Sequence, residues 1–287
     1  MNGLFRWAGG KGRIADKLFA LIDSHRGCGF HGAAPCIPPH IAPRWIEPFV
    51  GGGAMALEAL RRGIAHQYDL ADGSADVMSV YETLRQDAPS LFLELRRFQA
   101  MSELEQREQF LWQRRQVTDR MFACLRALRL LILQACGFNG LYRVNKSGVY
   151  NVSFGTKVAK FNFDRLQAAA ELLRRRNVVL AARDFAATIE QAGPCDIVYA
   201  GPPYLGTHSA YTSKGFDATE HRRLAQCLRD AASRGAVCWV SGSDCDETRA
   251  VYGGIAHVIQ VSRSISCKGS TRGTKTELLI RVGEHRN

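Results

Sequence analysis

Residues 45–62 read WIEPFVGGGAMALEALRR and carry the pattern of a strand, a turn and a helix in that order. WIEPFV is an apolar, β-like run, three glycines follow it, and AMALEALRR has apolar residues at helical spacing. Such a strand-to-helix turn lets the backbone approach a ligand at the helix N-terminus. The segment lacks the Gly-Lys-Ser/Thr spacing of a phosphate-binding loop, and by itself it is also compatible with a simple tight turn.

Strand and helix patterns alternate on both sides of this segment. Residues 64–70 predict a second strand, and residues 75–87 and 218–235 predict helices. Further strand patterns occupy residues 178–182, 196–200, 236–241, 257–262 and 277–282. This alternation predicts an α/β fold with a mostly parallel sheet that is covered on both faces.

The middle of the chain has a different pattern. Residues 90–136 show long helical periodicity with almost no strand signal. LYRV and VYNV then flank NKSG, which is typical of a hairpin with a basic tip. We therefore predict an α/β domain made of residues 1–76 and 156–287, with a helical insertion at 77–155 that contains a hairpin at 141–153.

Composition and charge indicate the class of partner and the compartment. The 287 residues include 38 Lys and Arg against 27 Asp and Glu, a net charge of +11. This excess predicts a polyanionic partner such as nucleic acid, although a basic surface alone would also account for it. No apolar run is long enough for a membrane helix, and the N-terminal residues do not resemble a signal peptide. Nine irregularly spaced cysteines indicate free thiols and a cytoplasmic protein.

Acidic residues follow two of the predicted strands. Asp72 comes about 20 residues after the glycine loop, where doubly wound folds hold ribose hydroxyls, so a nucleoside cofactor fits better than a dinucleotide. Asp184 and Phe185 follow the strand pattern at 178–182. Asp184 would accept a hydrogen bond from an adenine amine while Phe185 packs on the ring. An Asp that caps the following helix is the alternative interpretation.

Residues 198–206 read VYAGPPYLG, a strand that enters a rigid Pro-Pro-Tyr turn. Active-site turns of this kind usually carry an acceptor such as Asp or Asn directly before the prolines. This chain has Gly201 there.

The motifs occur in the order found in Dam-type DNA adenine-N6 methyltransferases of the alpha class, which the sequence resembles over nearly its whole length. The matching segments are RWAGGK, EPFVGGG, ADGSADVMSVY, FNGLYRVNKSGVYNVSFG, ARDF, the PPY turn and RSISCKGSTRGTKTELLI. The resemblance implies a Rossmann-like S-adenosylmethionine-dependent methyltransferase sheet with an inserted helical DNA-recognition domain and β-hairpin. It implies S-adenosyl-L-methionine as cofactor and double-stranded DNA as partner, with the target adenine flipped into a pocket beside the proline turn.

The resemblance also assigns site residues. Its catalytic turn is Gly201, Pro202, Pro203 and Tyr204. Its cofactor-binding residues are Trp7, Ala8, Gly9, Lys11, Phe49, Gly51, Gly53, Asp72, Asp184 and Phe185, with Trp7 and Lys11 around the methionine end. Its DNA-binding residues are Phe138, Asn139, Arg143, Asn145, Lys146, Ser264 and Arg272. Within this set Arg143 would recognise a guanine through O6 and N7.

The family has Asp, or less often Asn or Ser, where this chain has Gly201. A carboxylate there would accept one N–H of the adenine amine and the Pro202 carbonyl the other, so its loss predicts a slow enzyme. Three explanations are open: an engineered inactivating substitution, which we favour, a natural degenerate binder, or a carboxylate from elsewhere, such as Asp217 or Asp244. We predict a site-specific adenine-N6 methyltransferase of which this chain is a nearly inactive variant. The alternative is a non-catalytic protein that binds DNA and S-adenosylmethionine.

Other signals are weaker. Cys195 follows a proline like the nucleophile of cytosine-C5 methyltransferases, but it precedes a strand and is interpreted as structural. Cys28, His31, Cys36 and His40 have only a loose zinc-knuckle spacing, so we predict no metal. Methylation of RNA or of a protein amide is disfavoured by the basic hairpin. The pattern leaves open a monomer or homodimer, and a restriction-modification or solitary role, for a bacterial or phage-encoded, nucleoid-associated protein.

Overall fold

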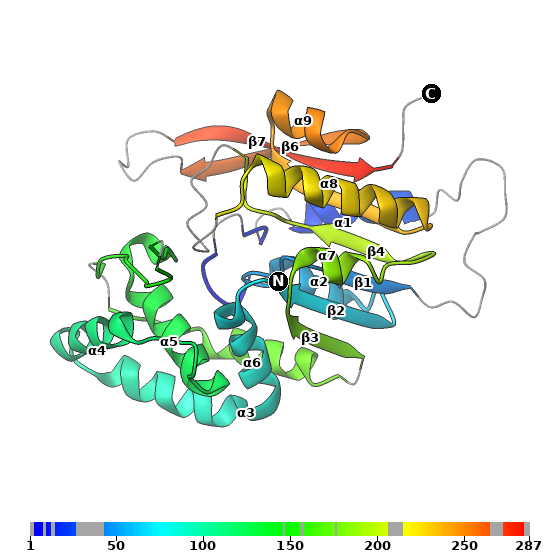
Figure 1. The fold of residues 1–287 in the computed structure, drawn as a ribbon. Coiled ribbons are helices and arrows are strands. Elements are labelled where there is room, and N and C mark those ends of the chain that lie inside the picture. Colours follow the sequence, from blue (N-terminus) through cyan, green and yellow to red (C-terminus); the bar gives the residue numbers. More distant parts are fainter. Residues whose placement is uncertain are drawn as a thin grey trace.

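The structure is a computed structural model. It describes residues 3–7, 10–12, 15–26, 43–145, 147–155, 158–175, 177–205, 215–264 and 272–283. Within these ranges, seven strands form one sheet in the order β3-β2-β1-β4-β5-β7-β6 (Figure 1). The strands are β1 Arg44–Glu47, β2 Gln67–Asp72, β3 Val178–Ala182, β4 Ile197–Ala200, β5 Val237–Ser243, β6 Ile255–Ser264 and β7 Arg272–Val282.

The first five strands of this order are parallel, and β7 joins β5 and β6 in antiparallel register. The mostly parallel α/β sheet predicted from the alternating pattern is therefore confirmed. Because β1 and β4 lie side by side at the centre, the segments that follow them leave the same edge of the sheet.

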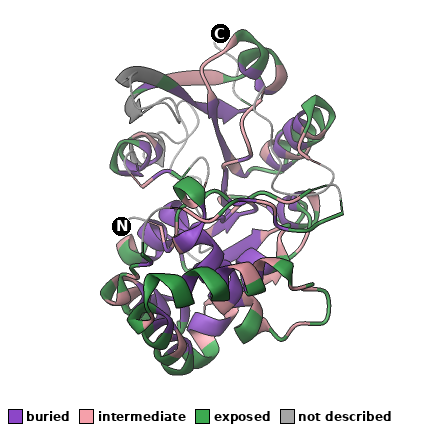
Figure 2. Ribbon diagram, turned by 90° about the vertical axis from the view of Figure 1, so that its left-hand side faces the viewer, coloured by how far each residue is buried: buried purple, intermediate pink, exposed green. Residues whose placement is uncertain are grey.

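Helices occupy both faces of the sheet and a separate group beside it. In chain order they are α1 Ala15–Arg26, α2 Ala54–Arg62, α3 Ala75–Ala100, α4 Glu103–Arg115, α5 Ala123–Cys136, the 3₁₀ turn η1 Phe138–Gly140, α6 Phe163–Leu173, α7 Phe185–Ile189, α8 Ala218–Ser233 and α9 Asp246–Tyr252. In Figure 1, α3, α4 and α5 gather at the end of the molecule away from β6 and β7. In Figure 2 the buried residues lie in the strands and on the inner sides of the helices.

Neighbouring residues of one strand contribute to different cores. Trp45, Tyr199 and Trp239 belong to the larger buried cluster. The adjacent Ile46 and Val198 belong to the cluster under α8. This alternation follows from the two-residue period of a strand, and it explains why the central strands carry apolar residues on both faces.

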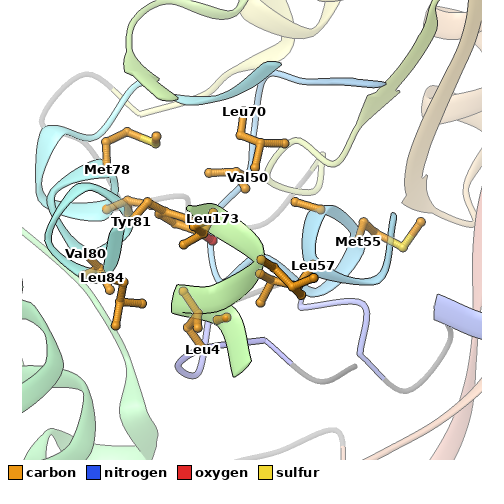
Figure 3. Close-up of a cluster of buried hydrophobic side chains, with 14 of the residues drawn as sticks. Leu4, Val50, Met55, Leu57, Leu70, Met78, Val80, Tyr81, Leu84 and Leu173 are labelled. Carbon is orange, nitrogen blue, oxygen red and sulfur yellow. The ribbon is translucent and has the colours of Figure 1, made fainter. Parts of the chain in front are cut away.

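The larger core also joins the N-terminal segment to the sheet. Figure 3 shows Leu4 beside side chains of α2, α3 and α6, including Leu57, Tyr81 and Leu173. The Leu4 N–H also donates a 2.7 Å hydrogen bond to the Gly52 carbonyl. The first residues of the chain are thereby held against the glycine loop.

Three details differ from the sequence-based prediction. The helix expected at 75–87 continues to residue 100 through a kink at Asp87, two residues before Pro89. Proline has no N–H for the preceding turn of a helix, which accounts for the kink. Asp72 is the last residue of β2 instead of following it. Helix α1 was not predicted, because the N-terminal residues were interpreted only as a glycine-rich motif.

Candidate active site

The loop between β1 and α2 is packed against the protein's own side chains. Gly51 has a φ of 46° and Gly53 a φ of 77°, both in the left-handed region that favours glycine. A Cβ on Gly51 would lie 2.5 Å from Cδ1 of Trp7, so the indole packs directly on the loop. The Tyr81 hydroxyl donates a 2.8 Å hydrogen bond to the Gly51 carbonyl. Glycine is required here by backbone conformation and by close packing, and Gly53 is the N-cap residue of α2.

Asp72, the last residue of the neighbouring strand β2, hydrogen-bonds to this loop. Its Oδ2 accepts from the Gly51 N–H at 3.0 Å and its Oδ1 accepts from the Ser74 N–H at 2.9 Å. Burial raises the pKa of Asp72 to about 6. The structure thus brings Asp72 and the glycine loop together, while the contact with a ribose stays a prediction.

Glu47 is a second carboxylate at this edge, and sequence reasoning did not single it out. It ends β1, is only 2% exposed, and its Oε2 accepts from Nε1 of Trp45 at 2.9 Å. Burial raises the pKa of this carboxyl from 4.5 to about 8. A glutamate at the end of an otherwise apolar strand is the signal that would have identified it.

Asp184 caps a helix and pairs with an arginine. Its Oδ1 accepts from the Ala186 N–H at 2.9 Å at the start of α7, so the capping interpretation is confirmed. The same carboxylate forms an ion pair with Arg223 of α8. A contact between Asp184 and an adenine amine stays a prediction.

Phe49 and Phe185 lie together, as expected for two residues of one site. Their rings are stacked with centroids 5.4 Å apart, and Phe216 meets Phe49 edge-on at 5.5 Å. The Arg223 guanidinium lies 4.4 Å from the centroid of the Phe185 ring. These contacts form an aromatic cluster beside the glycine loop.

The proline turn begins where β4 ends, between the central strands β1 and β5. Pro202 is buried, whereas Gly201, Pro203 and Tyr204 are half-buried. The end of β4 therefore presents the turn at the same sheet edge as the glycine loop.

Tyr204 is held by two charged side chains from distant parts of the chain. Its hydroxyl donates to Oε1 of Glu277 at 2.6 Å and accepts from Nζ of Lys11 at 2.5 Å. Lys11 also pairs with Oε2 of Glu277 at 3.0 Å. Lys11, expected near the methionine end of the cofactor, thus contacts the proline turn, and Glu277 is a site residue that the sequence reasoning missed.

No crowding or backbone strain requires glycine at position 201. A Cβ on Gly201 would lie 3.7 Å from the Ser241 Oγ and 3.7 Å from the Tyr199 hydroxyl, an ordinary contact distance. These two hydroxyls lie 2.9 Å apart and hydrogen-bond to each other. A Cβ at position 201 would therefore fit and would lie beside a polar pair.

The two carboxylates suggested as replacements for a catalytic acid are engaged elsewhere. Asp217 caps α8 by accepting from the Thr219 and Glu220 N–H groups at 2.8 and 3.0 Å. Asp244 pairs with Arg249 at 2.6 Å. Glu277 is a carboxylate that does reach the turn, through the hydroxyl of Tyr204.

The segment predicted as a hairpin has antiparallel pairing at Val144 and Tyr150. At its tip, Oδ1 of Asn145 accepts from the Val149 N–H at 2.9 Å. Arg143 is exposed, and its Nε donates to Oδ1 of Asn151 at 2.7 Å. The expected DNA-contacting side chains Arg143 and Asn145 are thus on one exposed turn.

The base of this hairpin is anchored to the glycine-loop region. The Tyr142 hydroxyl donates a 2.6 Å hydrogen bond to Oδ2 of the buried Asp76, at the start of α3. The rings of Tyr142 and Trp7 lie 5.5 Å apart. Trp7 therefore contacts both the glycine loop and the base of the hairpin.

Phe138 and Asn139, expected to contact DNA near the flipped base, lie in η1. Phe138 is 44% exposed and Asn139 has a φ of 56°. The side chain of the exposed Arg6 lies against Gly140 of this turn. Arg6 is a further cation at this surface that the sequence reasoning did not single out.

Several expected site residues cannot be placed. Ala8, Gly9 and Lys146 lie outside the described residues, and so does the Cys28–His40 segment. Ser264 and Arg272 are paired at the ends of β6 and β7, but their side chains lie outside the described part of the structure.

Cys195, interpreted as structural from the sequence, is half-buried and has a φ of 68°. His221 is buried, and its Nδ1 lies 2.6 Å from the Tyr252 hydroxyl. Among the described side chains, no group of three or more His, Cys, Asp or Glu residues is arranged to hold a metal ion.

The sequence of the chain is similar to those of several DNA methyltransferases. The chain is 32% identical over 289 residues to the DNA N-6-adenine-methyltransferase of Escherichia phage P1, covering 97% of this chain but 35% of the phage protein. It is 30% identical to the DNA adenine methylase of Vibrio cholerae O395, covering 99% of this chain and 97% of that protein. It is 25% identical to the type II methyltransferase M1.LlaDCHI of Lactococcus lactis subsp. cremoris, covering 96% and 93%.

No helix within the described ranges combines the length and apolar character needed to cross a membrane.

Residues 7–266 match the family described as D12 class N6 adenine-specific DNA methyltransferase. This match includes the glycine loop, the hairpin and the proline turn. The chain therefore belongs to the D12 class of N6 adenine-specific DNA methyltransferases.

Proposed function

We propose that this chain acts on double-stranded DNA as a site-specific adenine-N6 methyltransferase with S-adenosyl-L-methionine as methyl donor. The observation that carries this proposal is the Pro-Pro-Tyr turn at the end of β4, beside the glycine loop of β1, in a chain that belongs to this family. Ligands of α/β folds bind at this edge of the sheet.

The cofactor site fits a nucleoside with a short charged chain. Gly51 and Gly53 bring the backbone close to the start of α2, and Asp72 places a carboxylate beside them. Phe49 and Phe185 provide an apolar surface for an adenine ring. When bound, the cofactor supplies a methyl group on a sulfonium centre.

The proline turn would position the target base. The Tyr204 ring would stack on the flipped adenine, and the Pro202 carbonyl would accept one N–H of its amine. This bond would favour a pyramidal amine nitrogen, whose lone pair would then be available to accept a methyl group. Positioning and hydrogen bonding, without a covalent enzyme intermediate, would supply the rate.

We propose that residues 77–155 form the target-recognition insertion and that Arg143 contacts guanine. Arg143 is exposed on a short turn, and Asn145 organises that turn through its backbone bonds. Arginine donates two hydrogen bonds to O6 and N7 of guanine, which gives this contact sequence specificity.

We also propose that Gly201 makes methyl transfer slow in this chain. No side chain at position 201 is available to accept the second N–H of the adenine amine. Glycine there is not required by crowding, since the nearest atoms to a Cβ are 3.7 Å away. Losing one preorganised acceptor costs about 100- to 1000-fold in rate.

The test is tritiated-methyl transfer to unmethylated bacterial genomic DNA by this chain, Gly201→Asp and Gly201→Ala. Because genomic DNA contains every short sequence, the recognition site need not be known. We expect Gly201→Asp to be about 100- to 1000-fold faster than this chain. Gly201→Ala is the control, since it adds a Cβ and removes the backbone freedom of glycine without supplying an acceptor, and it should remain slow.

Equal rates for Gly201 and Gly201→Asp would contradict the proposed impairment. The alternative function, binding of DNA and cofactor without turnover, is favoured by the same glycine. Specific DNA binding together with no transfer by either Gly201 or Gly201→Asp would support that alternative.

A further inference from the structure

A buried ion pair and the tyrosine of the proline turn form one cluster. Lys11 comes from the N-terminal segment, Tyr204 from the turn after β4 and Glu277 from β7. The three polar groups lie 2.5 to 3.0 Å apart around the Tyr204 hydroxyl. The hydroxyl therefore joins three segments that are distant in sequence.

Both charged members are almost fully removed from water. Lys11 is 5% exposed and Glu277 is 2% exposed. Burying a charge is costly unless a partner of opposite charge and good hydrogen bonds compensate it. Each charge here has the other as a partner, and both hydrogen-bond the same hydroxyl, so the position of that hydroxyl is tightly restricted.

The constraint acts at the most effective point of the tyrosine side chain. A tyrosine ring pivots about its bonds near Cα, and the hydroxyl is the atom farthest from that pivot. Lys11 Nζ also lies 4.5 Å from the ring centroid. The hydroxyl oxygen lies on the Cβ–Cγ axis about which the ring turns, so holding it fixes the position and tilt of the ring. Rotation of the ring plane about that axis is restricted by the two directional hydrogen bonds at the hydroxyl and by the Lys11 ammonium beside the ring.

We propose that Lys11 and Glu277 are positioning residues that hold the Tyr204 ring in the orientation on which the flipped adenine stacks. This inference rests on the proposed function. It assigns to Lys11 a role in the base pocket, and it gives Glu277 a role in the reaction. In this chain, which has no acceptor at position 201, the fixed ring and the Pro202 carbonyl would carry the orientation of the base.

The same contacts would exist if the cluster only joined β7 to the N-terminal segment, so the experiment must separate these two roles. Tyr204→Phe keeps the aromatic ring and removes the hydroxyl. Glu277→Gln keeps the volume and an acceptor oxygen but removes the charge that pairs with Lys11. Tyr68→Phe is the matched control, because the buried Tyr68 hydroxyl also has two hydrogen-bond partners, the Ala65 N–H and the Ala59 carbonyl.

Each variant is made in this chain and in its Gly201→Asp version. The measurements are the thermal midpoint, the affinity for duplex DNA, the KM for S-adenosylmethionine and the kcat for tritiated-methyl transfer to unmethylated genomic DNA. We expect Tyr204→Phe to lower kcat by about 10-fold or more, since small misplacements of reacting groups have effects of this size. KM and DNA affinity should change by less than about 2-fold, which is a pure kcat effect of the kind expected from lost orientation.

Glu277→Gln should lower kcat in the same direction, and Tyr68→Phe should lower the thermal midpoint without lowering kcat. The inference is wrong if Tyr204→Phe retains the parent kcat, or if its kcat falls only as far as Tyr68→Phe does for the same loss of stability. If no methyl transfer is detected even with Gly201→Asp, the proposed function itself fails and the positioning role fails with it. Transfer by Gly201→Asp that is insensitive to Tyr204→Phe overturns the positioning role alone.

Discussion

The proline turn is held by contacts between residues far apart in the sequence, whereas the hairpin is held by contacts between residues close in the sequence. Tyr204 bonds to a residue 73 positions away, and the Lys11–Glu277 pair spans 266 positions. In the hairpin, Arg143 bonds to Asn151, eight positions away, and Asn145 bonds to Val149, four positions away. The turn depends on the assembled sheet, whereas the hairpin tip is organised largely by its own residues.

Burial differs in the same way. The ion pair at the turn is almost fully buried, whereas Arg143 and Asn145 are exposed. A buried group is fixed before a ligand binds, and an exposed turn remains able to adjust to one. The comparison indicates a preorganised proline turn and an adaptable hairpin, the element proposed to contact DNA, and the two are joined where Trp7 meets Tyr142.

The largest expected effect comes from breaking the buried Lys11–Glu277 ion pair. Glu277→Ala leaves the Lys11 ammonium buried without its carboxylate partner, which typically costs about 3–5 kcal/mol of unfolding free energy. Urea unfolding measures this loss. Replacing both members in Lys11→Met/Glu277→Gln should cost less than Glu277→Ala alone, and an equal or greater loss would show that the charge pairing is not the cause.

A mutation in the hairpin should leave the unfolding free energy nearly unchanged and weaken DNA binding. Arg143→Ala is expected to change unfolding free energy by less than about 0.5 kcal/mol, since the side chain is exposed. It should weaken binding to the recognised DNA by about 1–3 kcal/mol through the lost guanine contact. Fluorescence anisotropy on duplexes that contain the sites methylated by Gly201→Asp measures this effect.

The control for that experiment is Arg97→Ala on α3, which removes another exposed arginine, one that pairs locally with Glu94. Its affinity for the recognised duplex should change little. A uniform loss of affinity on every DNA sequence for Arg143→Ala would indicate a phosphate contact in place of a base contact.

The smallest expected effect concerns pH and the carboxylate at the end of β1. Burial raises the pKa of Glu47 from 4.5 to about 8. Between these values the folded protein holds more protons than the unfolded chain, so stability falls as pH rises, by up to about 1.4 kcal/mol per pH unit. Urea unfolding from pH 7 to 8 measures this slope, since the pKa of Asp72, which is raised to about 6, lies at least one pH unit below this window.

Glu47→Gln should flatten the slope between pH 7 and 8. Glu94→Gln, at a half-buried glutamate on α3, is the control, and its slope should stay that of the parent. A slope that persists in Glu47→Gln would assign the pH dependence to another group.

Much of the fold follows from local pattern. The strand at 178–182 and the helix that begins at 218 agree with the structure at those boundaries, because periodicity and capping residues are local properties. The kink at Asp87 and helix α1 were missed. The kink arises from Pro89, which lies inside helix α3. Helix α1 was not predicted, because the N-terminal residues were interpreted only as a glycine-rich motif.

The sequence alone determined the order of the motifs, the glycine loop, the Pro-Pro-Tyr turn and the absence of an acid at position 201, since all of these are contiguous along the chain. Only the tertiary structure decided which carboxylate meets the turn. Asp217 and Asp244 are near in sequence but are engaged by a helix cap and by Arg249. Glu277 reaches Tyr204 because β7 lies antiparallel beside β5, a pairing that no local pattern specifies.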